Sequence, residues 1–263
     1  MTAHRSPWLA GFGHRADPAL RVVALPYAGG RCTIYRDWPR LLSEDIEVVA
    51  VQYPGRGARS AERPLVDAKS AATQIAEALR PLLDRPYAIF GHCLGALIGF
   101  ELARHLAGTG RPPLRLLVSA RQAPDLPWPH QTVSDLPADE LLAALTGMGG
   151  TPEDLLEVPG LLDRALPAFR ADIRMEERYQ YAPGPSLECP ISVYGGRDDT
   201  VPAETLVGWD RQTVATTAVT WFPGGHFFLD TKRSALARQI ESDLRADLTP
   251  APTQGPEPEA TRA

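Results

Sequence analysis

The sequence predicts a doubly wound α/β fold built on a mostly parallel sheet. Short apolar runs bounded by glycine and proline recur along the chain, at residues 21–25, 46–52, 87–90, 114–120, 191–194 and 218–222. Most of these runs are continuous rather than alternating, which is typical of strands buried on both faces of a parallel sheet. Helical patterns at residues 68–83 and 94–107 lie between them. Strands that alternate with helices indicate helices packed on both faces of one sheet.

Residues 124–183 interrupt this alternation. They contain helical segments at about residues 137–146, 152–157 and 161–181, and no convincing strand. Because insertions of this size between sheet strands often form lids, we expect a helical lid here. The last residues, 249–263, are rich in Pro, Ala and Glu, a composition that predicts disorder. The expected organisation is therefore one domain over residues 1–248, with a lid insertion at about 124–183, followed by a disordered tail.

Composition excludes several classes of protein. The 263 residues carry 27 Lys and Arg against 32 Asp and Glu, and no long basic run that would indicate nucleic-acid binding. No stretch approaches the roughly 18 consecutive apolar residues of a membrane span, and residues 1–13 lack the apolar core of a signal peptide. The three cysteines are too widely spaced for a disulfide framework or a closely paired zinc site. We expect a cytoplasmic protein without metal or cofactor and, since no exposed apolar stripe is identifiable, a monomer.

The most informative segment is YAIFGHCLGALIG at residues 87–99, which reads as a strand, a sharp turn and the start of a helix. Its centre, from Gly91 through Cys93 to Gly95, has the form G-x-C-x-G. In a nucleophile elbow the central residue occupies a strained strand-to-helix turn, and the flanking glycines avoid collisions with neighbouring backbone. The motif alone is also compatible with a buried structural cysteine. The strand before it and the helix after it favour Cys93 as a nucleophile placed at a helix N-terminus, which favours a thiolate.

A thiolate nucleophile needs a base, and the base needs an acid to orient it. His226 lies in GGHFFL, where two glycines precede it and an apolar run anchors it, so we identify it as the base. The loop after the penultimate strand, GGRDDT, supplies Asp198 with Asp199 beside it, although an aspartate in such a loop often only caps a turn. The chain order nucleophile, acid, histidine is that of the α/β-hydrolases. The sequence therefore predicts an α/β-hydrolase fold with a Cys-His-Asp triad.

A third element follows the first predicted strand. The run LPYAGG at residues 25–30 is rich in small residues, which allow a backbone N–H to approach a substrate oxygen. We expect the N–H groups of Ala28 and Leu94 to form an oxyanion hole, in which each donor typically lowers a barrier by about 2.7–4 kcal/mol.

A family resemblance extends from about residue 22 to 244. Four stretches carry it: LPYAGG, VVAVQYPGRGAR, GHCLGALIGFELA and GGHFFL. The sequence resembles the type II thioesterases that accompany modular polyketide and nonribosomal peptide synthetases. The PGR element at residues 54–56 is the most specific, because general hydrolase chemistry does not demand it. The resemblance implies an acyl or aminoacyl substrate held as a thioester on the phosphopantetheine arm of an acyl or peptidyl carrier protein, which the lid admits.

Carried over to this sequence, the resemblance makes Cys93 the nucleophile, His226 the base, and Ala28 and Leu94 the oxyanion donors. The acid falls on Asp198, with Asp199 as the alternative. The sequence departs from the family at position 93, where most members carry serine. An acyl group on sulfur stays close in energy to the substrate thioester, so cysteine favours transfer to an acceptor over loss to water. Relatives with cysteine here are associated with shuttling acyl or aminoacyl groups between carrier proteins.

Three alternatives to a carrier thioesterase follow from these residues. One is an acyl or aminoacyl transferase between carriers. A second is a small-molecule hydrolase such as a dienelactone hydrolase, a group that also uses G-x-C-x-G but lacks the PGR element. A third is a non-catalytic carrier-docking protein, against which the retained histidine and acid argue.

Overall fold

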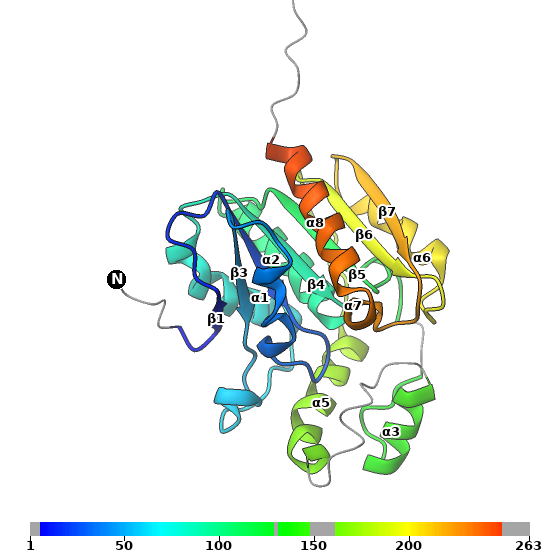
Figure 1. Cartoon of the computed structure of the whole chain (residues 1–263). Helices are drawn as coiled ribbons and strands as arrows, with labels where there is room; N and C mark the ends of the chain where they lie inside the picture. The colour runs from blue at the N-terminus through cyan, green and yellow to red at the C-terminus, as the bar shows by residue number, and fades with distance from the viewer. Residues whose placement is uncertain (1–5, 129–130, 148–160, 249–263) are drawn as a thin grey trace, which may run out of the picture.

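The computed structural model describes residues 6–128, 131–147 and 161–248, and within them seven strands form one sheet in the order β1-β3-β2-β4-β5-β6-β7 (Figure 1). β1 pairs antiparallel with β3, and every other neighbouring pair is parallel. The predicted mostly parallel sheet is confirmed, with β1 added at its edge. The strands are β1 (Leu9–Phe12), β2 (Leu20–Leu25), β3 (Ile46–Val51), β4 (Tyr87–His92), β5 (Arg115–Ser119), β6 (Ile191–Gly196) and β7 (Thr217–Phe222).

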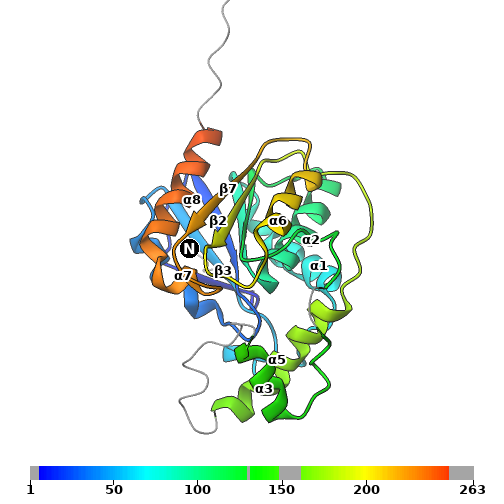
Figure 2. The ribbon, with the colours of Figure 1, turned by 90° about the vertical axis from the view of Figure 1, so that its right-hand side faces the viewer.

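Helices cover both faces of this sheet (Figures 1 and 2). On one face lie α1 (Ala68–Leu79), α2 (Leu94–Gly108) and α6 (Ala203–Val207), and on the other lie α7 (Phe228–Thr231) and α8 (Arg233–Leu248). Short 3-10 helices occupy the connections, namely η1 (Cys32–Tyr35), η2 (Trp38–Arg40), η3 (Gly57–Arg59), η4 (Arg80–Leu82) and η5 (Gly208–Gln212). This three-layer arrangement is the α/β-hydrolase fold that the sequence predicted.

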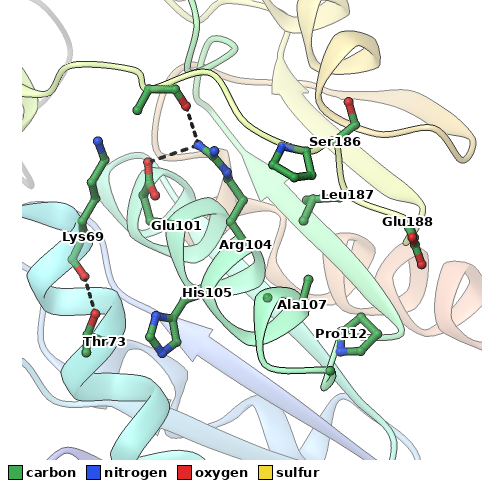
Figure 3. Close-up of a pocket in the computed structure, with 14 residues that line it drawn as sticks. Lys69, Thr73, Glu101, Arg104, His105, Ala107, Pro112, Ser186, Leu187 and Glu188 are labelled. Carbon is green, nitrogen blue, oxygen red and sulfur yellow. Dashed lines mark hydrogen bonds and ion pairs between the residues drawn. The ribbon is translucent and has the colours of Figure 1, made fainter.

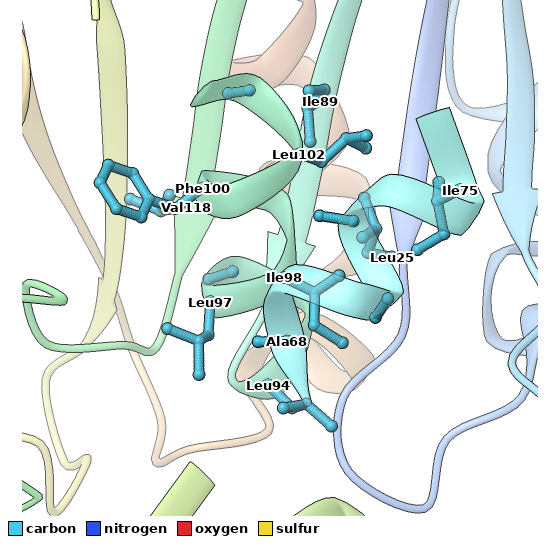
Figure 4. Packing of buried hydrophobic residues seen from close by; sticks show 14 of the residues in the cluster. Leu25, Ala68, Ile75, Ile89, Leu94, Leu97, Ile98, Phe100, Leu102 and Val118 are labelled. Atoms are coloured by element: carbon cyan, nitrogen blue, oxygen red, sulfur yellow. The ribbon is translucent and has the colours of Figure 1, made fainter. Parts of the chain in front are cut away.

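The central strands are buried on both faces, which explains their continuous apolar sequences. In β2, Val23 and Leu25 belong to the core beneath α1 and α2, whereas Val22 and Ala24 belong to the core beneath α8. Figure 4 shows the first of these cores, where Ile98 of α2 lies next to α1. Because α2 contacts both α1 and the strands, nearly its whole surface is apolar.

The insertion between β5 and β6 carries α3 (Ala138–Gly147) and α5 (Leu161–Arg178), which stand beyond one end of the sheet (Figures 1 and 2). These helices match the segments expected at residues 137–146 and 161–181. The expected helix at 152–157 and the tail 249–263 lie outside the described residues. Among the described helices, none combines the length and the apolarity that crossing a membrane requires.

Two glycines allow β2, β4 and α2 to approach one another closely around the elbow. A Cβ added to Gly91 would lie 2.1 Å from the carbonyl oxygen of Gly95, and one added to Gly95 would lie 2.2 Å from that of Leu25. Both obstacles are backbone atoms, which cannot swing aside as a flexible side chain can. The elbow therefore requires glycine at both positions for steric reasons alone.

We expect Gly95→Ala to lower the free energy of unfolding by about 3 kcal/mol or more, at the upper end of ordinary point substitutions, because the backbone of β2 or α2 must move. Thermal or denaturant unfolding measures this change. Gly108→Ala is the matched control, since a Cβ at this last residue of α2 meets no atom within 4 Å. It should leave stability unchanged or raise it by up to about 1 kcal/mol. Equal effects of the two substitutions would contradict the steric argument.

Candidate active site

Cys93 lies at a strained turn between β4 and α2. Its backbone has φ 53° and ψ −116°, a conformation that side chains other than glycine seldom adopt. Hydrogen bonds hold the turn on both sides: the N–H of Cys93 donates to the carbonyl of Ser119 (2.9 Å), and its carbonyl accepts from the N–H of Ala96 (3.0 Å). Its thiol is partly exposed, whereas Cys32 and Cys189 are buried. The fold thus presents one of the three sulfurs to incoming molecules.

His226 lies beside this sulfur, in the loop between β7 and α7. Its Nδ1 lies 3.1 and 3.2 Å from the two carboxylate oxygens of Asp199. The imidazole is 10% exposed and the Asp199 carboxylate 2% exposed. Burial lowers the pKa of His226, but the negative charge of Cys93 and hydrogen bonds with Asp199 and Cys93 outweigh it and raise the pKa to about 10. The imidazolium form of His226 is therefore favoured at neutral pH.

In the structure, His226 contacts Asp199, the alternative acid, rather than Asp198. Asp198 is exposed, and its carboxylate accepts a hydrogen bond from the N–H of Gly224 (3.3 Å), while its own N–H donates to the Gly224 carbonyl (3.0 Å). These bonds tie Asp198 to the turn before His226 and leave its carboxylate at the surface. Asp199 is turned inward, where it also accepts from the N–H of Val201 (3.2 Å). Asp198 thus has the turn-stabilising role common for aspartate in such loops.

Two backbone donors lie near the elbow. Ala28 follows β2, Leu94 is the first residue of α2, and both are buried. Within the described part of the chain, neither N–H donates to another protein group. The carbonyls of Leu25 and Pro26 lie against Gly95, so the loop that carries Ala28 runs alongside the N-terminus of α2. Both N–H groups therefore lack a protein acceptor in that part of the chain, which is a condition for the donors of an oxyanion hole.

A buried ion pair fixes this loop to the insertion. Asp172 of α5 accepts a hydrogen bond from the N–H of Gly29 (2.7 Å), next to Ala28. Both terminal nitrogens of the Arg56 guanidinium donate to the same carboxylate, with Nη2 at 2.7 Å from Oδ1. Arg56 is 5% exposed and Asp172 1% exposed. Breaking one partner of such a pair costs about 3–5 kcal/mol, so Arg56 of the PGR element is a structural anchor that joins α5 to the loop carrying Ala28 and Gly29.

A cavity of about 270 Å³ opens beside the sulfur. Glu176, one turn after Asp172 on α5, is 3% exposed, and its Oε1 accepts from the Cys93 thiol (3.7 Å) and from Nη1 of Arg121 (2.7 Å). Burial raises the pKa of Glu176, and the cations Arg121 and His226 counteract this effect. The cavity is lined by Cys93, Ala120, Arg121, Gln122, Trp128, Glu176, Thr200, Val201, Pro202 and His226.

Sequence reasoning missed Glu176 and Arg121 as site residues. The one available signal was the spacing of Asp172 and Glu176, four residues apart in a helical segment, which places two carboxylates on one face of α5. That spacing gives no indication of what the face contacts. Arg121 follows β5, at the same edge of the sheet as the elbow, but nothing in its sequence context marks it.

A larger cavity of about 700 Å³ lies away from the reacting groups, between α1, α2 and residues 182–188 (Figure 3). Arg104 reaches the carbonyl of Ala182 there (2.9 Å), and Lys69, Thr73 and His105 line its other sides. Neither Cys93 nor His226 borders it. The smaller cavity is therefore the candidate active site. Among the described residues, no group of three or more His, Cys, Asp or Glu side chains is placed to hold a metal ion.

Comparisons with known proteins agree with this arrangement. A family model described as "Thioesterase domain" matches residues 20–244. The gramicidin S biosynthesis protein GrsT of Aneurinibacillus migulanus is 35% identical over 245 residues, covering 92% of this chain and 96% of GrsT. The thioesterase PikA5 of Streptomyces venezuelae is 34% identical over 240 residues, covering 90% of this chain and 85% of PikA5.

Solved structures give the same result. The type II thioesterase BorB from the borrelidin biosynthetic cluster superposes with a TM-score of 0.85 at 39% identity, covering 93% of this chain and all of that one. RedJ, a thioesterase from the prodiginine pathway of Streptomyces coelicolor, gives a TM-score of 0.81 at 35% identity, covering 87% of this chain and 91% of that one. Fold, site geometry and these similarities together establish that the chain belongs to the thioesterase family and is a thioester hydrolase.

Proposed function

We propose that this enzyme is a type II thioesterase that acts on acyl or aminoacyl groups held as thioesters on a carrier protein of a polyketide or nonribosomal peptide synthetase. The observation that carries the proposal is the line of groups from Cys93 through His226 to Asp199, beside two unpaired N–H donors. The biosynthetic setting rests on the relatives, among them GrsT and BorB, whose names place them in gramicidin S and borrelidin biosynthesis.

The first half of the reaction transfers the acyl group to Cys93. The thiolate attacks the carbonyl carbon of the substrate thioester, and the N–H groups of Ala28 and Leu94 stabilise the charge that develops on the carbonyl oxygen. The bond from this carbon to the pantetheine sulfur breaks, and His226 gives its proton to the departing thiolate. Asp199 holds the imidazole in orientation throughout.

The second half releases the acyl group. His226, now neutral, takes a proton from water or from an acceptor thiol, whose oxygen or sulfur attacks the acyl carbon on Cys93. The bond to the Cys93 sulfur breaks, and the thiolate and imidazolium re-form. Water as the attacking group gives hydrolysis, and the thiol of a second carrier gives transfer. We assign the described part of the 124–183 insertion, α3 and α5, the role of the lid, because α5 places Glu176 directly against the sulfur.

We expect an acyl-loaded carrier protein to leave a covalent acyl adduct on the wild-type enzyme, detectable as a mass increase of the intact protein. Cys93→Ala should abolish the adduct because the attacking atom is gone. Cys189→Ala is the matched control, since that thiol is buried in the core and should not react. An adduct that survives Cys93→Ala, or no adduct on the wild-type enzyme, would refute the covalent mechanism.

Asp199→Asn should lower the turnover of a carrier thioester by about 10²–10⁴-fold, because the imidazolium loses its charged partner and its orientation. Asp198→Asn removes the same charge one residue earlier and should have little effect, since that carboxylate faces solvent and the Gly224 N–H. Steady-state kinetics of the two variants make the comparison. A larger loss with Asp198→Asn would restore Asp198 as the acid.

The cysteine supports transfer as a second candidate function, because an acyl group on sulfur reacts more readily with thiols and amines than an oxoester does. In a competition between water and a free second carrier, we expect Cys93→Ser to shift the products of an acyl-loaded carrier toward hydrolysis. Mass spectrometry of both carriers measures the ratio of transferred to hydrolysed acyl group. If this ratio is the same for both enzymes, the sulfur does not determine the fate of the acyl group.

A further inference from the structure

The carboxylate of Glu176 lies beside the sulfur that acts as an anionic nucleophile, which is an unusual place for a second negative charge. Its Oε1 lies 3.7 Å from the Cys93 sulfur, within the cavity that the acyl group must enter. Glu176 is almost fully buried, so water does not screen its charge. A negative charge there opposes both the thiolate and the oxyanion that forms during attack. The proposed mechanism gives Glu176 no task, so its position needs another explanation.

Glu176 has few hydrogen-bond donors once Cys93 is acylated. Its Oε1 lies 3.7 Å from the Cys93 sulfur and accepts from Arg121. An acylated sulfur carries no hydrogen, so within the described residues Arg121 is the donor left to this oxygen. A buried carboxylate with so few donors is costly to keep charged. A substrate that places its own donor at this point would offset that cost.

The distance from the sulfur specifies where such a donor would be. In an aminoacyl group on Cys93, the amino nitrogen is three bonds from the sulfur, at roughly 3–4 Å by ordinary bond geometry. The Glu176 oxygen lies at a similar distance from the same sulfur, so the two atoms can meet at hydrogen-bonding distance. An ammonium at this point would also offset the repulsion between Glu176 and the developing oxyanion.

We propose that Glu176 is a specificity-determining residue that binds the α-ammonium group of an aminoacyl thioester, which makes aminoacyl carriers the preferred substrates. The inference rests on the proposed function and deepens it. It differs from a general requirement for acyl thioesters, because it predicts discrimination between two acyl groups of the same size that differ only in the amino group.

The alternative is that Arg121 binds an acyl group that ends in a carboxylate. In its favour, the Nε of Arg121 has no protein partner within the described residues. Two contacts of the guanidinium argue against it. It already donates to Glu176, and it lies 5.6 Å from the centroid of the Trp128 ring. Moreover, Glu176 lies next to the sulfur and would repel a carboxylate on the acyl group.

The test compares initial rates of Cys93 acylation, measured by intact mass, for one carrier protein loaded in four ways. Alanyl and propionyl groups match in size and differ in the amino group, N-acetylalanyl lacks the charge, and succinyl carries a carboxylate. We expect the wild-type enzyme to load alanyl at least about tenfold faster than each of the others. Glu176→Gln keeps the shape and removes the charge, and it should reduce the alanyl to propionyl ratio by about tenfold. Glu140→Gln, an exposed carboxylate on α3, is the control and should keep the wild-type ratio.

The outcomes separate the two proposals. Equal loading of alanyl and propionyl groups by the wild-type enzyme overturns the inference while the proposed function stands. Fastest loading of the succinyl group also overturns it, because recognition would then be assigned to Arg121. An unchanged ratio in Glu176→Gln also overturns it. The wild-type comparison decides even if this variant does not fold, which thermal unfolding would reveal. Failure of all four groups to modify Cys93 refutes the proposed function itself.

Discussion

The geometry of the site depends on one close backbone contact, where β2, β4 and the start of α2 meet without side chains between them. Gly91 and Gly95 make this contact possible, since a Cβ at either position would overlap a carbonyl group. Cys93 is forced into a left-handed conformation by the same turn and is held there by the carbonyl of Ser119 in β5. The strain at one residue is thus balanced by the packing of the sheet centre, which keeps the sulfur and the free Leu94 N–H in fixed positions.

A second constraint joins three segments that are far apart in the sequence. Asp172 binds Arg56 of the PGR element and the backbone of Gly29, so α5, the PGR loop and the loop carrying Ala28 and Gly29 meet at one buried carboxylate. Glu176 lies one helical turn further along α5 and reaches the sulfur from there. The ion pair therefore sets the positions of the proposed oxyanion donor Ala28 and of the proposed specificity residue together. Neither can move far without leaving a charge buried and unpaired.

The sequence predicted the parts of the molecule that follow from local patterns. Continuous apolar runs predicted the central strands, and the flanking glycines predicted the elbow at Cys93. β1 was missed because it has four residues and a mixed burial pattern at the sheet edge, which leaves little hydrophobic signal. Asp198 was preferred over Asp199 because a one-residue choice in a turn depends on hydrogen bonds to a distant loop. The contact of Glu176 with Cys93 depends on how the insertion packs, which no local pattern encodes.

The charges around the sulfur connect the cysteine with the proposed substrate. His226 and Arg121 bring two positive charges, and Asp199 and Glu176 bring two negative charges. In the proposed mechanism, the Cys93 thiolate adds a third negative charge. Acylation consumes the charge of the thiolate, and an aminoacyl group adds a positive one beside Glu176. On this proposal, Glu176 also keeps the amine protonated, and an ammonium has no lone pair with which to attack a thioester. A cysteine that keeps the acyl group reactive and a carboxylate that keeps its amine unreactive would then act together in holding an aminoacyl group for transfer.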